Sequence, residues 1–389
     1  MRIALVSDWF APRIGGLERQ VQDLASELAT RGHEVHVITS TPGPQSGERG
    51  VIVHRLRGPR LPSLAVVGSR AGVRELDRLI EQGRFDVVHA HSALSPLSLL
   101  ALRTARGLRI PSVLTEHSVL RGAGAQMLWA LDHLVGWSDW PDVLTGVSRY
   151  VQHELEQLSD RTDVGVLHNG VSPAWWQQPV TVRDDGQLRL VSTMRLTRRK
   201  RPVDLVRLLA RVVRELPRGT PVKLCLIGDG PEAKNVQREA TRLGVAQHLE
   251  MAGWQPRECV RAWLARSSVF VLPTCKEALS IASLEALSAG LPVVAMDAGG
   301  VGDIVVDGRE GFLVPDEEAF GDAVLKLLRD ASLRQRMGAS GREHVRRFGW
   351  DRVIGVHEGF YEAARVRQIS TTQAAVRHDA TIYELSLST

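Results

Sequence analysis

Short apolar segments alternate with amphipathic helical stretches along most of this 389-residue sequence, and no other feature restricts the possible fold as strongly. Between the segments 2–7 and 35–39, apolar residues from Leu17 to Leu28 recur at helical spacing, and Gly32 follows them. Alternation of strand and helix is typical of a mostly parallel sheet with helices on both faces. We therefore expect an α/β protein built from doubly wound, Rossmann-like domains.

Two series of such segments follow one another, and the polar stretch 177–187 separates them. The first series predicts strands at 2–7, 35–39, 51–56, 86–89, 112–115, 142–147 and 164–168, and the second at 188–193, 223–227, 249–252, 269–272, 292–295 and 311–314. Helices of the second series are expected at 203–216, 234–243, 259–266, 283–289 and 320–337.

The length suits two domains rather than one. We expect an N-terminal domain over 1–176 and a C-terminal domain over 187–350, facing each other across a cleft, with 177–187 as the linker. A helical pattern at about 353–369 is expected to return to the first domain, and the polar end at 370–389 to form a disordered tail.

Composition excludes several classes of protein. No stretch reaches the roughly 18 apolar residues that a membrane span needs. The three cysteines, Cys225, Cys259 and Cys275, show no C-x-x-C spacing, which argues against a disulfide framework and for a cytoplasmic protein. The net charge of +5 suits an acidic ligand or an anionic surface. Because no zinc-finger or RNA-binding motif accompanies this charge, nucleic acid is not an expected partner.

The segment after the predicted strand 269–272 carries the strongest signal for a ligand site. Glu277 and Glu285 stand eight residues apart, before and within the next predicted helix. Ser280 is expected to cap that helix, which leaves the amides of Ile281 and the next two residues free to bind an anion. The structural alternative is a solvent-facing Glu277 and a Glu285 paired with an arginine.

A basic turn after the strand 188–193 carries a second signal. Arg195 and Lys200 are five residues apart, and both are expected to converge on one diphosphate. Arg198, Arg199 and Arg201 are expected to be solvated. The alternative for the whole turn is a solvated basic loop.

Together these two segments resemble the E-x7-E signature and the basic turn of family 4 glycosyltransferases, which are retaining enzymes of the GT-B fold. The resemblance extends from the N-terminal glycines to about Val314. It implies that Glu277 contacts the donor sugar and that Glu285 contacts the ribose of a nucleotide-sugar donor.

The sequence departs from the family pattern in two places. The family usually has Gly-Phe-Gly where this chain has Ala278-Leu279-Ser280, and this leaves the shape of the sugar pocket open. Met194 and Arg201 replace glycines of the basic turn. The loop 299–304 resembles the family's Gly-Gly-x-x-Glu loop, with Asp303 in place of the glutamate.

The resemblance also assigns roles in the first domain. Gly15 and Gly16 fit the glycine loop that lies over the donor phosphates, and a Gly-rich turn that opens a helix suits a phosphate. His117 stands where a family histidine often lies near the donor sugar. His89 and His91 are expected to form polar walls on the acceptor side, and no metal site is expected because no carboxylate stands at ligand spacing.

Trp254 follows the predicted strand 249–252, near the expected place of the nucleotide base. Its ring is expected either to stack on the base or to belong to the core.

Three other functions remain open on the sequence. The stretch 228–233 fits G-x-G-x-x-A, and Glu250 follows at the distance of a ribose-binding acid, which favours an NAD-dependent oxidoreductase. A nucleotide-sugar epimerase and a non-catalytic sugar-binding protein share the expected architecture.

The resemblance implies sugar transfer with retention, without cofactor or metal ion, and the sequence contains no D-x-D motif. The donor expected is a UDP-sugar, with UDP-GlcNAc favoured because HAHS, TEHS and SDWF resemble segments of the GlcNAc transferases of GPI-anchor synthesis. The N-terminal domain is expected to bind the acceptor and the C-terminal domain the nucleotide sugar. The acceptor is an unidentified hydroxyl, with a lipid-linked acceptor as one option. The basic stretch 55–74 is expected either to touch the inner membrane face or to form a solvated loop and helix.

Overall fold

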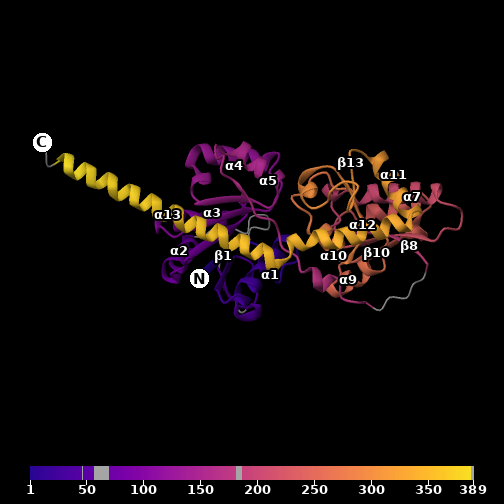
Figure 1. Cartoon of the computed structure of the whole chain (residues 1–389), viewed down its shortest axis with the longest axis horizontal. Helices are drawn as coiled ribbons and strands as arrows, with labels where there is room; N and C mark the ends of the chain where they lie inside the picture. The colour runs from indigo at the N-terminus through magenta and orange to yellow at the C-terminus, as the bar shows by residue number, and fades with distance from the viewer. Residues whose placement is uncertain (46, 57–69, 181–185, 387–389) are drawn as a thin grey trace. The chain divides into compact units, whose positions relative to one another are not determined.

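The structure is a computed structural model that describes residues 1–45, 47–56, 70–180 and 186–386 (Figure 1). It divides the chain into two compact units. Unit 1 comprises Met1–Gly170 with Trp350–Thr389, and unit 2 comprises Val171–Gly349. Most of the stretch 55–74 and the middle of the linker 177–187 lie outside the described residues.

Unit 1 contains a seven-stranded sheet of order β3-β2-β1-β4-β5-β6-β7, and all its strand pairs are parallel. Its elements are β1 (Arg2–Val6), α1 (Gly16–Thr30), β2 (Glu34–Thr39), β3 (Ile52–Arg55), α2 (Arg70–Gly83), β4 (Val87–His91), α3 (Pro96–Gly107), β5 (Ser112–Glu116), α4 (Ala123–Val135), β6 (Val143–Gly146), α5 (Arg149–Leu158), β7 (Gly165–Val166) and α13 (Trp350–Ser386).

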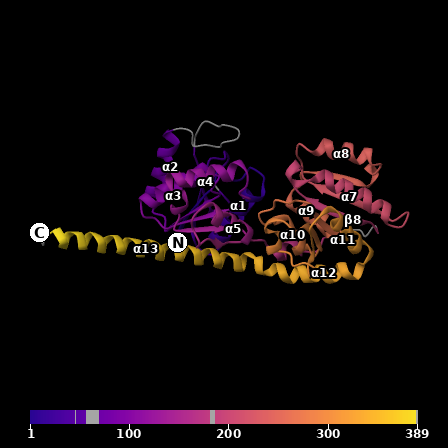
Figure 2. The same cartoon turned by 90° about the horizontal axis from the view of Figure 1, so that it is seen from above.

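Unit 2 contains a six-stranded parallel sheet of order β10-β9-β8-β11-β12-β13. Its elements are α6 (Pro173–Trp176), β8 (Leu188–Thr193), α7 (Pro202–Glu215), β9 (Val222–Ile227), α8 (Ala233–Arg242), β10 (Leu249–Gly253), α9 (Arg257–Ala265), β11 (Val269–Leu272), α10 (Ile281–Ala289), β12 (Val293–Met296), β13 (Gly311–Val314), α11 (Glu317–Arg329) and α12 (Ala331–His344). Helices α7 and α8 lie side by side (Figure 2).

Both sheets confirm the predicted fold class of doubly wound, Rossmann-like domains. In each sheet the strand order reverses once, between β1 and β4 in unit 1 and between β8 and β11 in unit 2. Buried aliphatic side chains of the strands and of the covering helices form the core of each unit. Because ligands of such sheets bind beyond the carboxyl ends of the strands at the reversal, the segments after these four strands are where a site is expected.

The single helix predicted at 320–337 is wrong, because α11 and α12 meet there. Asp330 leaves the helical conformation at φ −116° and ψ 95°, and its side chain accepts a hydrogen bond from Leu333 N. The apolar periodicity runs through both helices and hides this break.

Helix α13 packs against α1 and over β4, β5 and β6 of unit 1 (Figures 1 and 2). Its side chains His357 and Tyr361 are 5% and 0% exposed. The sequence predicts a disordered tail over 370–389, whereas the backbone of α13 continues as a helix to Ser386, and 387–389 lie outside the described residues.

Candidate functional site

The reversal of strand order in unit 2 brings two predicted site residues together. Lys200 belongs to the segment after β8, and Glu277 to the segment after β11, the neighbouring strand. Lys200 Nζ donates a hydrogen bond to Glu277 Oε2 at 2.5 Å, and the two side chains are 17% and 15% exposed. A cation and a carboxylate are therefore held at the edge of the sheet where ligands of this fold bind.

The backbone of Glu277 is fixed by the glycines of the loop after β12. Gly300 N donates to the Glu277 carbonyl oxygen at 2.8 Å. Gly299 has a φ of +79°, and a Cβ at Gly299 would overlap that carbonyl. Both observations require glycine at Gly299, so this loop positions Glu277 through close backbone packing.

Arg195 does not join the pair formed by Lys200 and Glu277. Its side chain is exposed and makes no ion pair with the part of the chain that the structure describes. The predicted convergence of Arg195 and Lys200 on one diphosphate stays a prediction.

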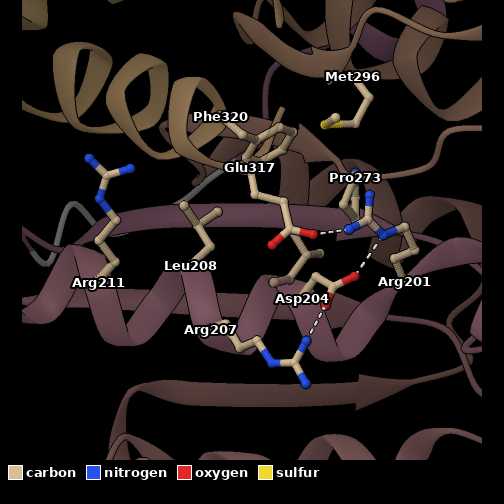
Figure 3. A pocket seen from close by; sticks show the side chains of 10 residues that line it. Arg201, Asp204, Arg207, Leu208, Arg211, Pro273, Met296, Glu317 and Phe320 are labelled. Atoms are coloured by element: carbon tan, nitrogen blue, oxygen red, sulfur yellow. Dashed lines mark hydrogen bonds and ion pairs between the residues drawn. The ribbon is translucent and has the colours of Figure 1, made fainter. Parts of the chain in front are cut away.

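The expectation that Arg201 is solvated is wrong, because this residue joins three segments of unit 2. Its guanidinium pairs with Asp204 at 2.7 Å and with Glu317, and it donates to Cys275 Sγ at 3.1 Å (Figure 3). Its partners from the β11–α10 segment and from α11 are distant in sequence, so no local pattern reveals them.

Beside Arg201 lies a cavity of about 180 Å³ that the sequence does not predict (Figure 3). It is lined by Arg201, Asp204, Leu205, Arg207, Leu208, Arg211, Pro273, Met296, Glu317 and Phe320. Its three arginines all form ion pairs with carboxylates of unit 2. The cationic groups of this cavity are therefore already neutralised.

Helix α10 begins and ends as predicted. Ser280 is the N-cap, and its Oγ accepts from Ser283 N at 3.3 Å, while Gly290 ends the helix in a left-handed conformation. The Ser283 amide already donates a hydrogen bond to Ser280 and is not free to bind an anion. The predicted anion site is therefore reduced to the amides of Ile281 and Ala282. Glu285 lies in the second turn of α10 and is partly exposed.

The glycines that favour an NAD-dependent oxidoreductase have a structural function instead. Gly228 and Gly230 have φ values of +130° and +158°, and a Cβ on either would overlap the carbonyl of Met194 or Leu196. Leu196 N also donates to the Asp229 carbonyl at 2.9 Å. This glycine turn packs closely against the basic turn, and that packing requires the glycines. A bound dinucleotide is therefore not needed to explain why they are present.

Trp254 follows β10 and is 55% exposed. Its ring is not part of the core, which removes one of the two options that the sequence left open. Stacking on a nucleotide base stays a prediction.

In unit 1, the half-buried His117 contacts a cluster of buried histidines at the carboxyl ends of β4 and β5. His117 Nε2 lies 3.0 Å from His91 Nδ1, and His89 Nε2 lies 2.8 Å from the Thr115 hydroxyl. His357 from α13 lines the same small cavity as His91 and His117. The expectation that His89 forms a polar wall for an acceptor is wrong, because His89 is fully buried against Tyr361.

Burial keeps His117 uncharged at neutral pH. The pKa of His117 is lowered to about 3, because burial disfavours the charged ring and His357 lies nearby, although a hydrogen bond with Asn169 opposes the shift. A neutral ring can exchange hydrogen bonds with a sugar, but it does not neutralise a phosphate. The sequence does not predict Asn169 and His357 here; the only signal for Asn169 is a polar residue shortly after a strand.

Two buried carboxyl groups, which the sequence also does not predict, organise this edge of unit 1. Asp8 Oδ2 accepts from the Ser95 hydroxyl at 2.6 Å, and Glu116 Oε2 accepts from Ala93 N at 2.6 Å. Burial raises the pKa of both groups. They tie the segment after β1 and the last residue of β5 to the segment after β4, and thereby shape the loops around the reversal.

Gly15 caps α1, which starts at Gly16, as the glycine turn predicts. A Cβ on Gly15 would overlap the carboxylate of Glu18, which pairs with Arg13 at 2.9 Å. The turn therefore packs closely on an acidic side chain. Donor binding by Gly15, Gly16 and His117 stays a prediction.

Over the described ranges, no three His, Cys, Asp or Glu side chains are grouped so that they could hold a metal ion. Within the same ranges, no helix is both long and apolar enough to cross a membrane.

Comparisons with known proteins cover both units. Residues 14–175 match the model of Glycosyltransferase Family 4, and residues 176–344 match the model of Glycosyl transferases group 1. The N-acetyl-alpha-D-glucosaminyl L-malate synthase of Bacillus anthracis is 27% identical, over 90% of this chain and 94% of its own length. A phosphatidylinositol N-acetylglucosaminyltransferase component of Arabidopsis thaliana is 28% identical, over 84% of this chain and 74% of its own.

Among solved structures, Anabaena Alr3699/HepE in complex with UDP-glucose superimposes with a TM-score of 0.74 at 19% identity, and covers 94% of this chain and 100% of its own. This likeness concerns the fold and agrees with the two parallel sheets described above. With both units matched by family models, the resemblance expected from the E-x7-E segment is confirmed, and the chain belongs to glycosyltransferase family 4.

Proposed function

We propose that this glycosyltransferase moves a hexose or an N-acetylhexosamine from a nucleotide-diphosphate sugar to a hydroxyl acceptor, with retention of configuration and without a metal ion or cofactor. The observation that carries this proposal is the contact between Lys200 and Glu277 at the strand reversal of unit 2. It joins a phosphate-binding cation to a carboxylate suited to sugar hydroxyls.

In this mechanism the donor diphosphate replaces Glu277 as the partner of Lys200. The released Glu277 carboxylate then accepts a hydrogen bond from a hydroxyl of the donor sugar. Negative charge grows on the leaving phosphate as the glycosidic C–O bond breaks. Lys200, Arg195 and the first free amides of α10 stabilise that charge, each by about 2.7–4 kcal/mol if comparable to an oxyanion-hole donor. A phosphate oxygen accepts the proton of the acceptor hydroxyl, which attacks from the same face, so configuration is retained.

The donor is proposed to be a UDP-sugar, and UDP-GlcNAc in particular. Two relatives whose names include N-acetylglucosaminyl groups support this choice, as does a structural neighbour that binds UDP-glucose. Glu285 and the exposed ring of Trp254 are proposed to bind the ribose and the base. We also propose a cytoplasmic location, which the three free cysteines support.

The test is a panel of nucleotide sugars incubated with the full chain and assayed for release of nucleotide diphosphate. Slow hydrolysis of one donor, without any added acceptor, is expected. Protection by NAD but not by nucleotide diphosphates in thermal unfolding would overturn the proposal in favour of an oxidoreductase. An isomerised sugar without hydrolysis would instead identify an epimerase.

A further inference from the structure

A small cavity of unit 1 has two buried polar atoms on its wall that bond to no group of the described chain. The atoms are His91 Nε2 and Trp350 Nε1, and the two residues are 2% and 5% exposed. The cavity has a volume of about 10 Å³, and His117 and His357 also line it. Because a buried polar atom without a partner is costly, a pair of them at one cavity indicates that a ligand binds there.

The size and the polar groups of the cavity fit a single water molecule. A buried water needs roughly 10–15 Å³ of volume and two to four hydrogen-bond partners. Trp350 Nε1 is a donor only. His357 Nδ1 lies 2.9 Å from the Val353 carbonyl oxygen and therefore carries hydrogen. Burial lowers the pKa of His357 to about 4, so its ring is neutral at pH 7 and its Nε2 is an acceptor.

His91 and His117 share one hydrogen between them. His91 Nδ1 lies 3.0 Å from His117 Nε2, and burial lowers the pKa of both rings, which are neutral at pH 7. A water that accepts from Trp350 Nε1 has two hydrogens to donate, one to His91 Nε2 and one to His357 Nε2. His91 must then carry its own hydrogen on Nδ1 and donate it to His117 Nε2. The single hydrogen of His117 is therefore on Nδ1.

A second contact of His117 selects the same tautomer. Burial and the nearby His357 lower the pKa of His117, whereas a hydrogen bond with Asn169 raises it. That bond therefore favours the protonated ring, so the Asn169 side chain accepts a hydrogen from His117. Because His117 Nε2 already lies against His91, this hydrogen belongs to Nδ1.

Helix α13 fixes the tautomer of the neighbouring His89 by direct contacts. The Thr145 hydroxyl donates to the Leu114 carbonyl oxygen at 3.1 Å, so the Thr115 hydroxyl, 2.8 Å away, donates to Thr145. His89 Nε2 lies 2.8 Å from the Thr115 oxygen and must donate to it. Since burial keeps this ring neutral, His89 Nδ1 accepts from the Tyr361 hydroxyl of α13 at 2.9 Å.

We propose that one buried water molecule binds in the cavity and joins Trp350 Nε1, His91 Nε2 and His357 Nε2. Through this water Trp350 acts as a positioning residue and holds His117 in the tautomer with hydrogen on Nδ1. Trp350 and His357 both belong to α13, so this helix fixes a group at the carboxyl edge of the unit 1 sheet. The use of His117 for a sugar rests on the proposed function: a sugar hydroxyl bound there accepts from Nδ1–H.

The water is tested by a crystal structure of the full chain at a resolution that shows ordered waters. We expect one water within about 2.7–3.2 Å of Trp350 Nε1, His91 Nε2 and His357 Nε2. A Trp350 indole that contacts a protein acceptor directly, or a cavity without density for a water, overturns the proposal.

The positioning role is tested by nitrogen NMR of the full chain labelled at histidine, which distinguishes a ring nitrogen that carries hydrogen from one that does not. The His117 signals are assigned by their loss in His117→Gln. In the wild type only Nδ1 of His117 is expected to carry hydrogen. Trp350→Phe keeps an aromatic ring without the N–H, and it is expected to lose this single state and show a mixture of tautomers.

The matched control is Trp176→Phe, at a buried tryptophan of unit 2 whose Nε1 likewise bonds to no group of the described ranges. It should keep the wild-type tautomer pattern. Hydrogen on Nε2 of His117 in the wild type, or an unchanged pattern in Trp350→Phe, overturns the positioning role. If Trp350→Phe does not fold, the wild-type tautomer and the crystal structure still decide. Neither measurement needs a donor, so a failure of the sugar-transfer proposal shows only in the hydrolysis panel.

Discussion

Arg201 and Ser280 adopt left-handed backbone conformations, with φ values of +55° and +79°. For an L-residue other than glycine this costs roughly 1–2 kcal/mol. Both residues stand where the family pattern has glycine. Each has a compensating contact: Arg201 forms its ion pairs, and Ser280 caps α10. This chain therefore tolerates strain beside both predicted donor contacts.

Ser280→Gly is expected to be more stable than Ser280→Ala by about 1 kcal/mol in free energy of unfolding, because both lose the hydroxyl but only alanine keeps the left-handed strain. Urea unfolding of the two variants measures the difference. Equal stabilities would show that the backbone relaxes at this position and that no strain is held there.

Lys200→Ala is expected to lower turnover by about 10²–10³-fold, as removal of an oxyanion-hole donor does, because it leaves the departing phosphate without its main cation. Donor hydrolysis measures the effect. Arg199→Ala, an exposed position of the same turn, is the matched control and should remain near wild type. Near-normal turnover of Lys200→Ala with unchanged donor affinity would contradict the leaving-group assignment.

Residue types and spacing locate Lys200 and Glu277 in the sequence, since the motif and the strand ends mark both. Their direct contact is not visible there, because 77 positions separate them and only the strand order brings them together. The contacts of Arg201 escape prediction for the same reason, because its partner Glu317 is 116 positions away. Contacts across a sheet depend on the strand order, so the spacing of residues along the chain does not predict them.

At the scale of elements, strand positions are predicted well because buried parallel strands are short apolar runs bounded by turns. Helix breaks are predicted poorly. Between α11 and α12 the apolar pattern continues, and a single side chain, Asp330, marks the new N-terminus. Its carboxylate accepts from Leu333 N at 2.8 Å, and that hydrogen bond lowers the pKa of Asp330.

Asp330→Ala is expected to lower the Tm of unit 2 by about 2–4 °C, because the first turn of α12 loses its N-cap. Calorimetry or circular dichroism measures the shift. Glu343→Ala, an exposed position of the same helix, is the control and should leave Tm nearly unchanged. If both variants have the same Tm, the Asp330 cap does not stabilise the start of α12.

At the scale of the whole molecule, the two units repeat one architecture but differ in chemistry at the strand reversal. Unit 2 places a cation and a carboxylate there, whereas unit 1 places neutral histidines and buried carboxyl groups. An edge without net positive charge suits an uncharged hydroxyl better than a diphosphate. This contrast supports the expectation that the donor binds to unit 2 and the acceptor to unit 1.

The buried histidines make unit 1 sensitive to acid. Burial lowers the pKa of His89, His91, His117 and His357, the last two to about 3 and about 4. Their ordinary value in the unfolded chain is about 6.5, so the unfolded state binds more protons below that pH. Stability from these groups is complete above pH 6.5 and is lost as the pH falls toward their folded values.

Each such histidine is expected to lower the free energy of unfolding by about 1.4 kcal/mol for each pH unit below pH 6.5. Asp8 and Glu116 act in the opposite direction, because burial raises the pKa of both carboxyl groups. Hydrogen exchange at pH 7 and pH 5.5 is expected to show faster opening of β4 and β5 at the lower pH. His357→Gln removes one titrating group and should reduce this dependence; an unchanged slope would show that the cluster does not titrate on unfolding.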